Sequence, residues 1–141
     1  MARIYLAGAM GCYGKNYEKS EDWRKKATSL FHLHGYHKVF DPTLYYRYGC
    51  DYHKTEKEIM RYELAQLKKC DVCLVNLDDY DKSVGTIQEI FYAFQNNIPI
   101  VGFMEKYKIE NIHPWIIEEC TRIEDDTSAL DDAVCYINGY F

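Results

Sequence analysis

Proline is scarce in this sequence: its 141 residues include three prolines, and no linker, repeat or low-complexity tract interrupts them. The longest uninterrupted apolar run, residues 98–104, is far shorter than the roughly 20 residues that cross a bilayer. The first ten residues have too short an apolar part for a secretory leader, and Tyr5 interrupts it. We therefore expect a cytoplasmic chain without a membrane-spanning segment, folded as one domain over residues 1–141.

Basic residues are fewer than acidic residues. The chain has 17 Lys and Arg against 22 Asp and Glu, which gives a net charge of −5. Affinity for nucleic acid rests largely on neutralising phosphates, so this balance argues against a nucleic-acid polymer as partner. Apolar residues make up 48% and charged residues 28% of the chain, which excludes a disordered chain and predicts a globular domain.

Apolar stretches alternate with amphipathic ones along the chain. Strands are expected at residues 3–8, 38–40, 71–77, 98–103 and 121–123, and helices at residues 20–34, 55–69, 86–96, 114–120 and 128–137, with Gly139 past the end of the last helix. Apolar strands between such helices predict an α/β fold, a parallel sheet covered on both faces. Ligands bind such sheets beyond the carboxyl ends of the strands, which here collect residues 8–15, 41–51, 78–85 and 104–112.

The loop after the first strand is rich in glycine. It carries Gly8, Gly11, Gly14 and Lys15. Backbone amides in such a loop can turn toward an anion with a cation beside them. The spacing fits neither the Walker A motif nor the dinucleotide fingerprint. An anion-binding loop and a flexible turn that uses glycine for its dihedral angles therefore both stay open.

Two glutamates are candidates for catalysis. Glu63 falls within the apolar stripe of its expected helix, so it should either form a salt bridge, with Arg61 or Arg24, or lie at a cleft. Glu89 falls in the first turn of its expected helix, whose positive end favours an ionised carboxylate. Periodicity directs Glu89 away from the apolar stripe and, taken alone, predicts a solvated side chain. That stripe consists of Ile87, Ile90, Phe91 and Phe94.

Two groups of side chains imitate metal sites. The first is the acidic loop with Asp78, Asp79 and Asp81; the second is the set Cys50, His53, Cys70 and Cys73. Turn chemistry accounts for the aspartates better than Mg²⁺ does. Cysteines three apart on a strand point to opposite faces and cannot share one zinc ion. No metal is expected, and the six cysteines of an intracellular chain are expected to be reduced.

A tyrosine-rich stretch occupies residues 45–48, and Tyr52 and His53 follow it. Aromatic side chains of this kind can stack on nucleobases. Because the chain lacks a basic face, we expect a pocket for one small-molecule base rather than a groove for a single strand.

Four short segments resemble the nucleoside 2-deoxyribosyltransferase family in their order and spacing. They are Ile4-Tyr-Leu-Ala-Gly8, Glu63-Leu-x6-Asp71-Val, Ser83-Val-Gly-Thr-Ile-Gln-Glu89-Ile-Phe-Tyr-Ala93 and Ile98-Pro-Ile. The resemblance covers most of the chain up to residue 104, and it implies a flavodoxin-like sheet of strand order 2-1-3-4-5. It also implies that Glu89 is the nucleophile, against the periodicity argument, and that Tyr5 hydrogen-bonds to Glu89 and orients it.

Two positions depart from the usual pattern of that family. Glu63 stands where most members have an aspartate that acts on the leaving base. The resemblance therefore implies that Glu63 is the acid that protonates this base. Ser83 stands where nucleoside-transferring members carry an aspartate that contacts the sugar 5′-hydroxyl. The resemblance implies a serine at this position in the related branch that hydrolyses deoxynucleoside 5′-monophosphates. A hydroxyl can donate to a phosphate, whereas an aspartate would repel it.

Further substrate contacts are expected around a 5′-phosphate. The candidates are Gly8, Gly11, Gly14, Lys15, Asp79 and Gly85. The negative charges of Asp79 and Asp81 count against a phosphate at this place, whereas the charge of Lys15 favours it.

The resemblance implies a double displacement at the anomeric carbon of a 2-deoxyribosyl unit. Glu89 attacks, Glu63 protonates the departing base, and a second base or water captures the resulting glycosyl-enzyme ester. This chemistry needs no metal or organic cofactor. Family members are homo-oligomers whose sites borrow residues from a neighbour, for which residues 138–141 are a candidate. The alternative is a nucleotide-binding sensor without catalysis, which the glutamate at position 63 would favour.

Overall fold

The computed structural model describes residues 1–13, 18–35, 37–45 and 53–141. Its parallel sheet consists of β1 (Arg3–Ala7), β2 (Lys38–Phe40), β3 (Val72–Asn76), β4 (Ile100–Phe103) and β5 (Arg122–Glu124). The strands lie in the order β2-β1-β3-β4-β5, which confirms the predicted flavodoxin-like α/β fold. The order reverses between β1 and β3, where sheets of this kind bind ligands.

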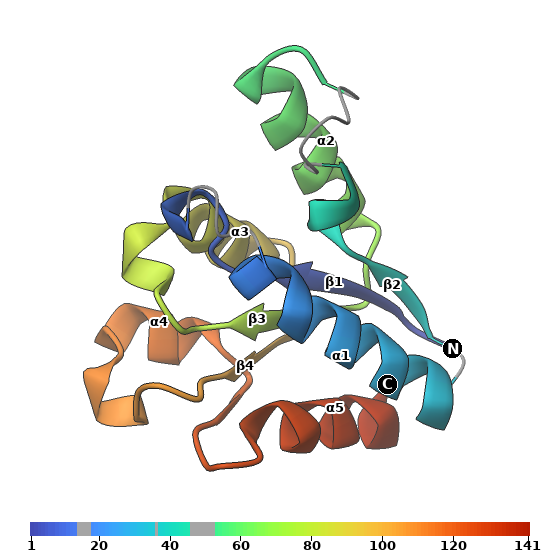
Figure 1. Ribbon diagram of the computed structural model, residues 1–141, viewed down its shortest axis with the longest axis vertical. Helices are drawn as coiled ribbons and strands as arrows, with labels where there is room; N and C mark the ends of the chain where they lie inside the picture. The colour runs from blue at the N-terminus through green and yellow to red at the C-terminus, as the bar shows by residue number, and fades with distance from the viewer. Residues whose placement is uncertain (14–17, 36, 46–52) are drawn as a thin grey trace.

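Helices cover both faces of the sheet. They are α1 (Glu18–His34), α2 (Glu56–Lys68), α3 (Val84–Gln95), α4 (Pro114–Glu119) and α5 (Ala129–Tyr140). In Figure 1, α1 and α5 lie side by side along one face, and α2 stands out at the top of the view. Among the described residues, no helix is long and apolar enough to span a bilayer.

Successive side chains of β1 enter two different cores, as the pleat of a strand requires. Ile4 and Leu6 point toward α1 and α5, where they pack with Phe31 and Ala133. Tyr5 points to the opposite face, into the core that Ile90 of α3 helps to form. Both cores exclude water from the strands, and the second core places a tyrosine hydroxyl inside it.

The main differences from the predicted elements lie at helix ends. α3 begins at Val84, two residues earlier than expected, because the Ser83 side chain accepts a hydrogen bond from the Thr86 amide and caps the helix. α5 continues to Tyr140, so Gly139 lies inside the helix and the prediction that it follows the helix is wrong. The assignment of residues 1–141 to one domain stays a prediction.

Candidate active site

Glu89 and Tyr5 meet at the buried face of α3. The hydroxyl of Tyr5 donates a hydrogen bond to Oε2 of Glu89, across 84 positions of sequence. Tyr5 is inaccessible to water, and Glu89 is 9% exposed. A buried carboxylate requires such a partner, since an unpaired one costs several kcal/mol, roughly. The fold therefore brings together the two residues that the family resemblance had paired.

Helical periodicity placed the wrong face of α3 in the core. Of the predicted apolar stripe, Ile90 is buried, but Phe91 and Phe94 are 48% and 50% exposed. The buried face instead contains Thr86, Glu89, Ile90 and Ala93. Periodicity fails here because Glu89 has a buried hydrogen-bond donor on a distant strand, which no pattern within the helix reveals. The periodicity-based expectation of a solvated Glu89 is wrong.

The ionisation of Glu89 is finely balanced. Burial raises the pKa of Glu89, and the Tyr5 hydrogen bond and the charge of Arg24 oppose that rise, which leaves a pKa of about 7. Burial and the nearby carboxylates, first Glu89 and then Glu63, raise the pKa of Tyr5 well above its usual value. Tyr5 therefore stays protonated and donates a hydrogen bond to Glu89 when that carboxyl group is ionised.

Glu63 approaches the same site from α2. Its Oε1 is buried and has no hydrogen-bond partner among the described residues. Burial, and after it the charge of Glu89, raises the pKa of Glu63 to about 8, although the charge of Arg24 acts in the other direction. No ion pair joins Glu63 to Arg61 or Arg24 in the described part of the chain. Of the two predicted situations, a cleft therefore suits Glu63 better than a salt bridge.

The apolar stripe predicted for α2, which consists of Ile59, Met60, Leu64 and Leu67, reaches the core only in part. Leu67 is buried, whereas Met60 is 47% exposed. The first turns of α2 stand away from the sheet (Figure 1), and Glu63 is the eighth of the thirteen residues of this helix. Glu63 is partly exposed as a residue, although its Oε1 is buried.

An aromatic wall extends from Tyr5 toward α2. The rings of Tyr5 and Phe40 stack with centroids 5.3 Å apart, and Phe40 stacks in turn on Tyr45 at 5.4 Å. Tyr62 packs against Tyr45 at 5.5 Å, and His53 against Tyr62 at 5.0 Å. Tyr45 and His53 belong to the predicted base-stacking stretch, and residues 46–52 lie outside the described part. Phe40 and Tyr62 were not among the predicted site residues; Tyr62 precedes Glu63, which is the signal that could have found it.

The first turn of α3 forms the other side of the site. Ser83 caps this helix, and its hydroxyl also lies 2.8 Å from that of Thr86. Gly85 is exposed, and a Cβ built on it would meet no atom within 4 Å. Free amides at a helix N-terminus, with open space in front of them, suit an anionic group.

Asp79 is neutralised by its neighbours. Its carboxylate accepts hydrogen bonds from the Tyr13 hydroxyl at 2.8 Å and from Lys106 at 3.1 Å, and Lys82 lies 3.5 Å away. Burial works against ionisation, but the hydrogen bonds from Tyr13 and Lys106 bring the pKa of Asp79 below its usual value. An ionised but paired Asp79 repels a nearby phosphate less than the sequence alone suggests.

The glycine loop is described only in part. Gly8 follows β1, and a Cβ there would come within 2.9 Å of the Trp23 ring, so close packing requires glycine. Gly11 begins the short helical turn η1 (Gly11–Tyr13). Gly14 and Lys15 lie outside the described residues, and their proposed contacts with substrate stay predictions.

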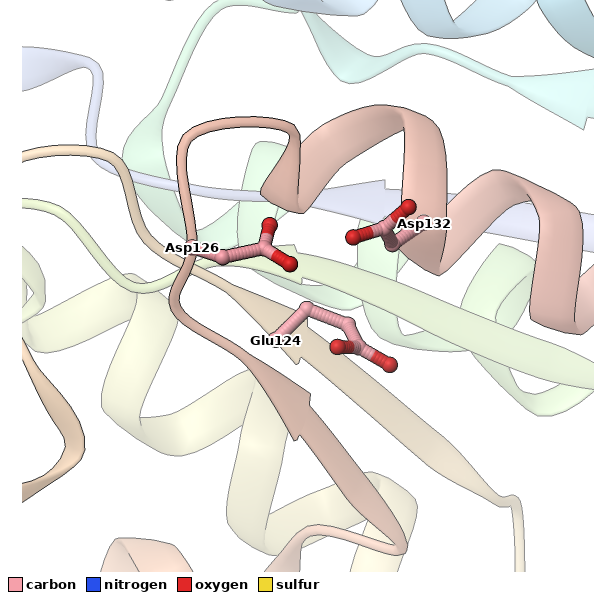
Figure 2. A group of neighbouring side chains, drawn as sticks. All are labelled: Glu124, Asp126 and Asp132. Atoms are coloured by element: carbon pink, nitrogen blue, oxygen red, sulfur yellow. The ribbon is translucent and has the colours of Figure 1, made fainter.

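The described residues contain one group of carboxylates close enough to share an ion. Figure 2 shows Glu124, Asp126 and Asp132 facing one another near the start of α5. The hydroxyl of Ser128 lies within hydrogen-bond distance of both aspartates, and Glu124 is paired with Arg122. These contacts explain the cluster without an ion. In the cysteine and histidine set that imitates a zinc site, Cys73 is fully buried in the core, the Cys70 thiol donates to the Gln66 carbonyl, and Cys50 lies outside the described part.

A separate hollow of about 390 Å³ lies beside α1. It is lined by Trp23 and Leu130 and by the lysines at positions 19, 26 and 106. Each of these lysines already contacts an aromatic ring or a carboxylate. The hollow therefore offers an anion no unpaired lysine among the described residues that line it, and it is distinct from the Tyr5–Glu89 site.

Comparison with known proteins identifies the family of the chain. The family model for nucleoside 2-deoxyribosyltransferase matches residues 4–125. The chain belongs to the nucleoside 2-deoxyribosyltransferase family. Membership makes it an enzyme that transfers or hydrolyses N-glycosyl groups, with nucleosides or nucleotides as its class of substrate. No curated protein matches the chain in sequence.

Solved structures share the fold of this family member at low sequence identity. A 2-deoxyribosyltransferase from the psychrotolerant bacterium Bacillus psychrosaccharolyticus is 22% identical with a TM-score of 0.72, over 99% of this chain and 93% of the other. A conserved protein from Enterococcus faecalis V583 is 14% identical with a TM-score of 0.76, over 97% and 99%. The CMP N-glycosidase BcmB of Clostridium botulinum is 12% identical with a TM-score of 0.62, over 98% and 99%.

Proposed function

We propose that this protein cleaves the N-glycosidic bond of 2′-deoxyribonucleosides or their 5′-monophosphates through a covalent bond between Glu89 and the sugar. The observation that carries the proposal is the buried hydrogen bond from Tyr5 to Glu89. This hydrogen bond fixes Oε2 of Glu89 and leaves the other carboxylate oxygen to attack the anomeric carbon. Fixing a nucleophile in this way removes much of the entropy cost of attack.

Glu63 acts as the acid in this proposal. A leaving base needs a proton on its nitrogen, and a carboxyl group with a pKa of about 8 holds one at neutral pH. Its Oε1, buried without a partner, is free to hydrogen-bond to a base. One negative charge on Glu89 then stabilises the cationic sugar in the transition state.

The aromatic wall supports a nucleobase as the group that leaves. Phe40 stacks on Tyr5, which binds the nucleophile, and Tyr45 links Phe40 to Tyr62, the residue that precedes the acid in the chain. Stacking on such rings is worth about 1–3 kcal/mol per base and is tolerant of base identity. A flat heterocycle is therefore the partner that suits this wall.

The start of α3 supports a 5′-phosphate on the sugar. Ser83 and the amides near Gly85 lie one to two turns before Glu89, at the positive end of the helix. Lys82 and Lys106 neutralise Asp79 beside them. We therefore favour deoxynucleoside 5′-monophosphates over free nucleosides as substrates.

A panel of substrates tests the proposed function. Purified protein is incubated with deoxynucleosides and their 5′-monophosphates, with and without adenine as acceptor, and products are separated by chromatography. Released base without exchange identifies a hydrolase, and exchange identifies a transferase. Intact-mass analysis after an acid quench should reveal the deoxyribosyl adduct on the native protein but not on Glu89→Gln. If no substrate in the panel releases base, the proposal is wrong.

The same panel tests a nucleotide-binding sensor. The observation that favours a sensor is the glutamate at position 63, where the family usually has the shorter aspartate. A sensor would bind a deoxynucleotide in calorimetry without releasing base. Glu63→Asp should then leave the protein inactive, whereas in an enzyme it should retain measurable turnover.

We further propose that two or more copies associate through α3. Val84, Ile87, Phe91 and Phe94 form a row along its outer face, spaced three or four residues apart, and Val84 is 71% exposed. A row of exposed apolar side chains is typical of an association surface. Phe91→Ser should lower the mass found by sedimentation, and Gln88→Ser, on the same helix, should not. A mass unchanged by Phe91→Ser would refute the α3 contact.

A further inference from the structure

The largest fully buried side chain of the described chain belongs to Arg24 of α1. Its Nη1 donates to the Ser20 carbonyl at 2.6 Å, and its Nη2 to the Gly8 carbonyl at 3.0 Å. Gly8 lies three residues after Tyr5 on the same segment. The guanidinium therefore reaches from α1 over the carboxyl end of the strand that positions Glu89.

Burial of this guanidinium is compensated only in part by its direct contacts. Asp41 is the acidic group in contact, with 3.8 Å between Nε and Oδ1. The same oxygen already accepts hydrogen bonds from the amide and the hydroxyl of Thr43. Nε itself has no hydrogen-bond partner among the described residues. A buried cation with an unsatisfied donor destabilises a fold unless further negative charge faces it.

That further charge comes from the site. Asp41 after β2 acts most strongly on Arg24, followed by Glu89 on α3, the Tyr5 hydroxyl on β1 and Glu63 on α2. Burial lowers the pKa of Arg24, and these groups oppose that change. In return, the charge of Arg24 lowers the pKa of both glutamates against the effect of their burial.

We propose that Arg24 is a positioning residue that balances the single negative charge of the Glu63–Glu89 pair throughout the reaction. The proposal rests on the proposed function. In the first step a Glu89 oxygen bonds to the anomeric carbon and the glycosidic C–N bond breaks. The electron pair of that bond goes to the base nitrogen, which takes the proton of Glu63.

The net charge of the Glu63–Glu89 pair, which Arg24 balances, stays the same during this step. Glu89 becomes a neutral ester at the moment when Glu63 becomes a carboxylate, so the pair carries one negative charge before and after the step. When water captures the sugar, Glu63 takes a proton from the water and Glu89 recovers its charge. A fixed cation that serves both states needs no rearrangement during the reaction, which is the condition for electrostatic preorganisation.

Titration of the glutamate carboxyl groups tests this proposal without requiring turnover. Protein labelled with carbon-13 at glutamate carboxyl carbons is titrated by NMR, and Glu89→Gln assigns the Glu89 signal. We expect Arg24→Met to raise the midpoint of Glu89 by about one pH unit, a tenfold gain in proton affinity. Arg24→Lys, which keeps the charge, should return the midpoint toward that of the native protein.

Two controls make the result specific. Arg122→Met removes an exposed arginine paired with Glu124 and should leave the Glu89 midpoint unchanged. If Arg24→Met does not fold, the double variant Arg24→Met/Asp41→Asn removes the cation with its partner and is compared with Asp41→Asn alone. A Glu89 midpoint that stays the same without the Arg24 charge overturns the proposal. A shifted midpoint in a protein that releases no base overturns the proposed function, and with it the role of Arg24 in the reaction, and leaves only the effect of the Arg24 charge on Glu89.

Discussion

Glu63 and Glu89 lie on different helices, yet the charge of Glu89 helps to raise the pKa of Glu63, after the larger effect of burial. Burial also raises the pKa of Glu89, to about 7, while that of Glu63 reaches about 8. Between these two values Glu89 is ionised and Glu63 keeps its proton. Two chemically identical side chains thereby acquire the opposite protonation states that a nucleophile and an acid require.

The first prediction is a bell-shaped dependence of kcat on pH, with a maximum between pH 7 and pH 8. The rate should fall below the maximum as Glu89 takes up a proton, and above it as Glu63 loses one. Initial rates of base release across a pH series measure both limbs. Glu63→Gln should lower kcat by about 10²–10⁴-fold and remove the upper limb, because the acid is gone. A rate that still rises well above pH 8 would contradict the role of Glu63.

The second prediction concerns the nucleophile. Glu89→Gln keeps an oxygen that accepts the Tyr5 hydrogen bond but cannot form the ester, so base release should fall by about 10³-fold or more. Gln88→Ala changes the exposed neighbour on the same helix and should leave kcat close to its native value. Circular dichroism of both variants should match the native protein. Native turnover in Glu89→Gln would remove Glu89 from the mechanism.

The third prediction isolates the Tyr5 hydroxyl. Tyr5→Phe preserves the ring that stacks on Phe40 and removes the hydrogen bond to Glu89. Because that bond lowers the pKa of Glu89, the acidic limb of the pH profile should move to higher pH. At pH 7 the rate should fall by about 10-fold or more, through lost ionisation and lost orientation. Phe40→Leu is the comparison: it disturbs the same stack and should not move the limb.

The fold was predictable because apolar strands alternate with helices in a simple pattern. The strand order and the pairing of Tyr5 with Glu89 came from short motifs that resemble a family, and so did the proposal that Glu89 is the nucleophile. Helical periodicity predicted that Phe91 and Phe94 of α3 are buried and that Glu89 is exposed, whereas both phenylalanines are exposed and Glu89 is buried. A carboxylate stabilised by a tyrosine on a distant strand leaves no periodic trace in its own helix.

Arg24 illustrates a different limit of the sequence. It lies three residues before Ala27 and seven before Phe31, so helical spacing places it on the buried face of α1. That position was a usable signal for a buried cation. Its partners, the Gly8 and Ser20 carbonyls and Asp41, come from three segments, and their convergence is a property of the folded chain.

The fourth prediction tests the preference for a 5′-phosphate. Ser83→Asp should shift preference from monophosphates toward free nucleosides, by about 10-fold or more in the ratio of kcat/KM, because the new carboxylate repels the phosphate. Asp is a good helix cap, so α3 should stay folded. Ser83→Asn, a cap without charge, is the matched control and should retain the native preference. Equal ratios in the two variants would remove the phosphate argument.

The fifth prediction links the raised pKa of Glu63 to stability. In the unfolded chain the Glu63 carboxyl has its ordinary pKa of 4.5, and in the folded protein about 8. Between these pH values the folded state binds more protons than the unfolded state, so the free energy of unfolding falls as pH rises through this window. Below it the group contributes its full stability, and above it that contribution is lost.

Glu63→Gln, which resembles the protonated acid, should not lose this stability at high pH. From about pH 5 to about pH 9, the free energy of unfolding of Glu63→Gln should gain about 1–3 kcal/mol relative to the native protein, after allowance for partial solvent exposure. Urea unfolding at the two pH values measures the gain. Glu118→Gln, an exposed glutamate changed in the same way, should show no such gain. Parallel loss of stability in Glu63→Gln and the native protein would mean that Glu63 titrates normally and holds no proton for the leaving base.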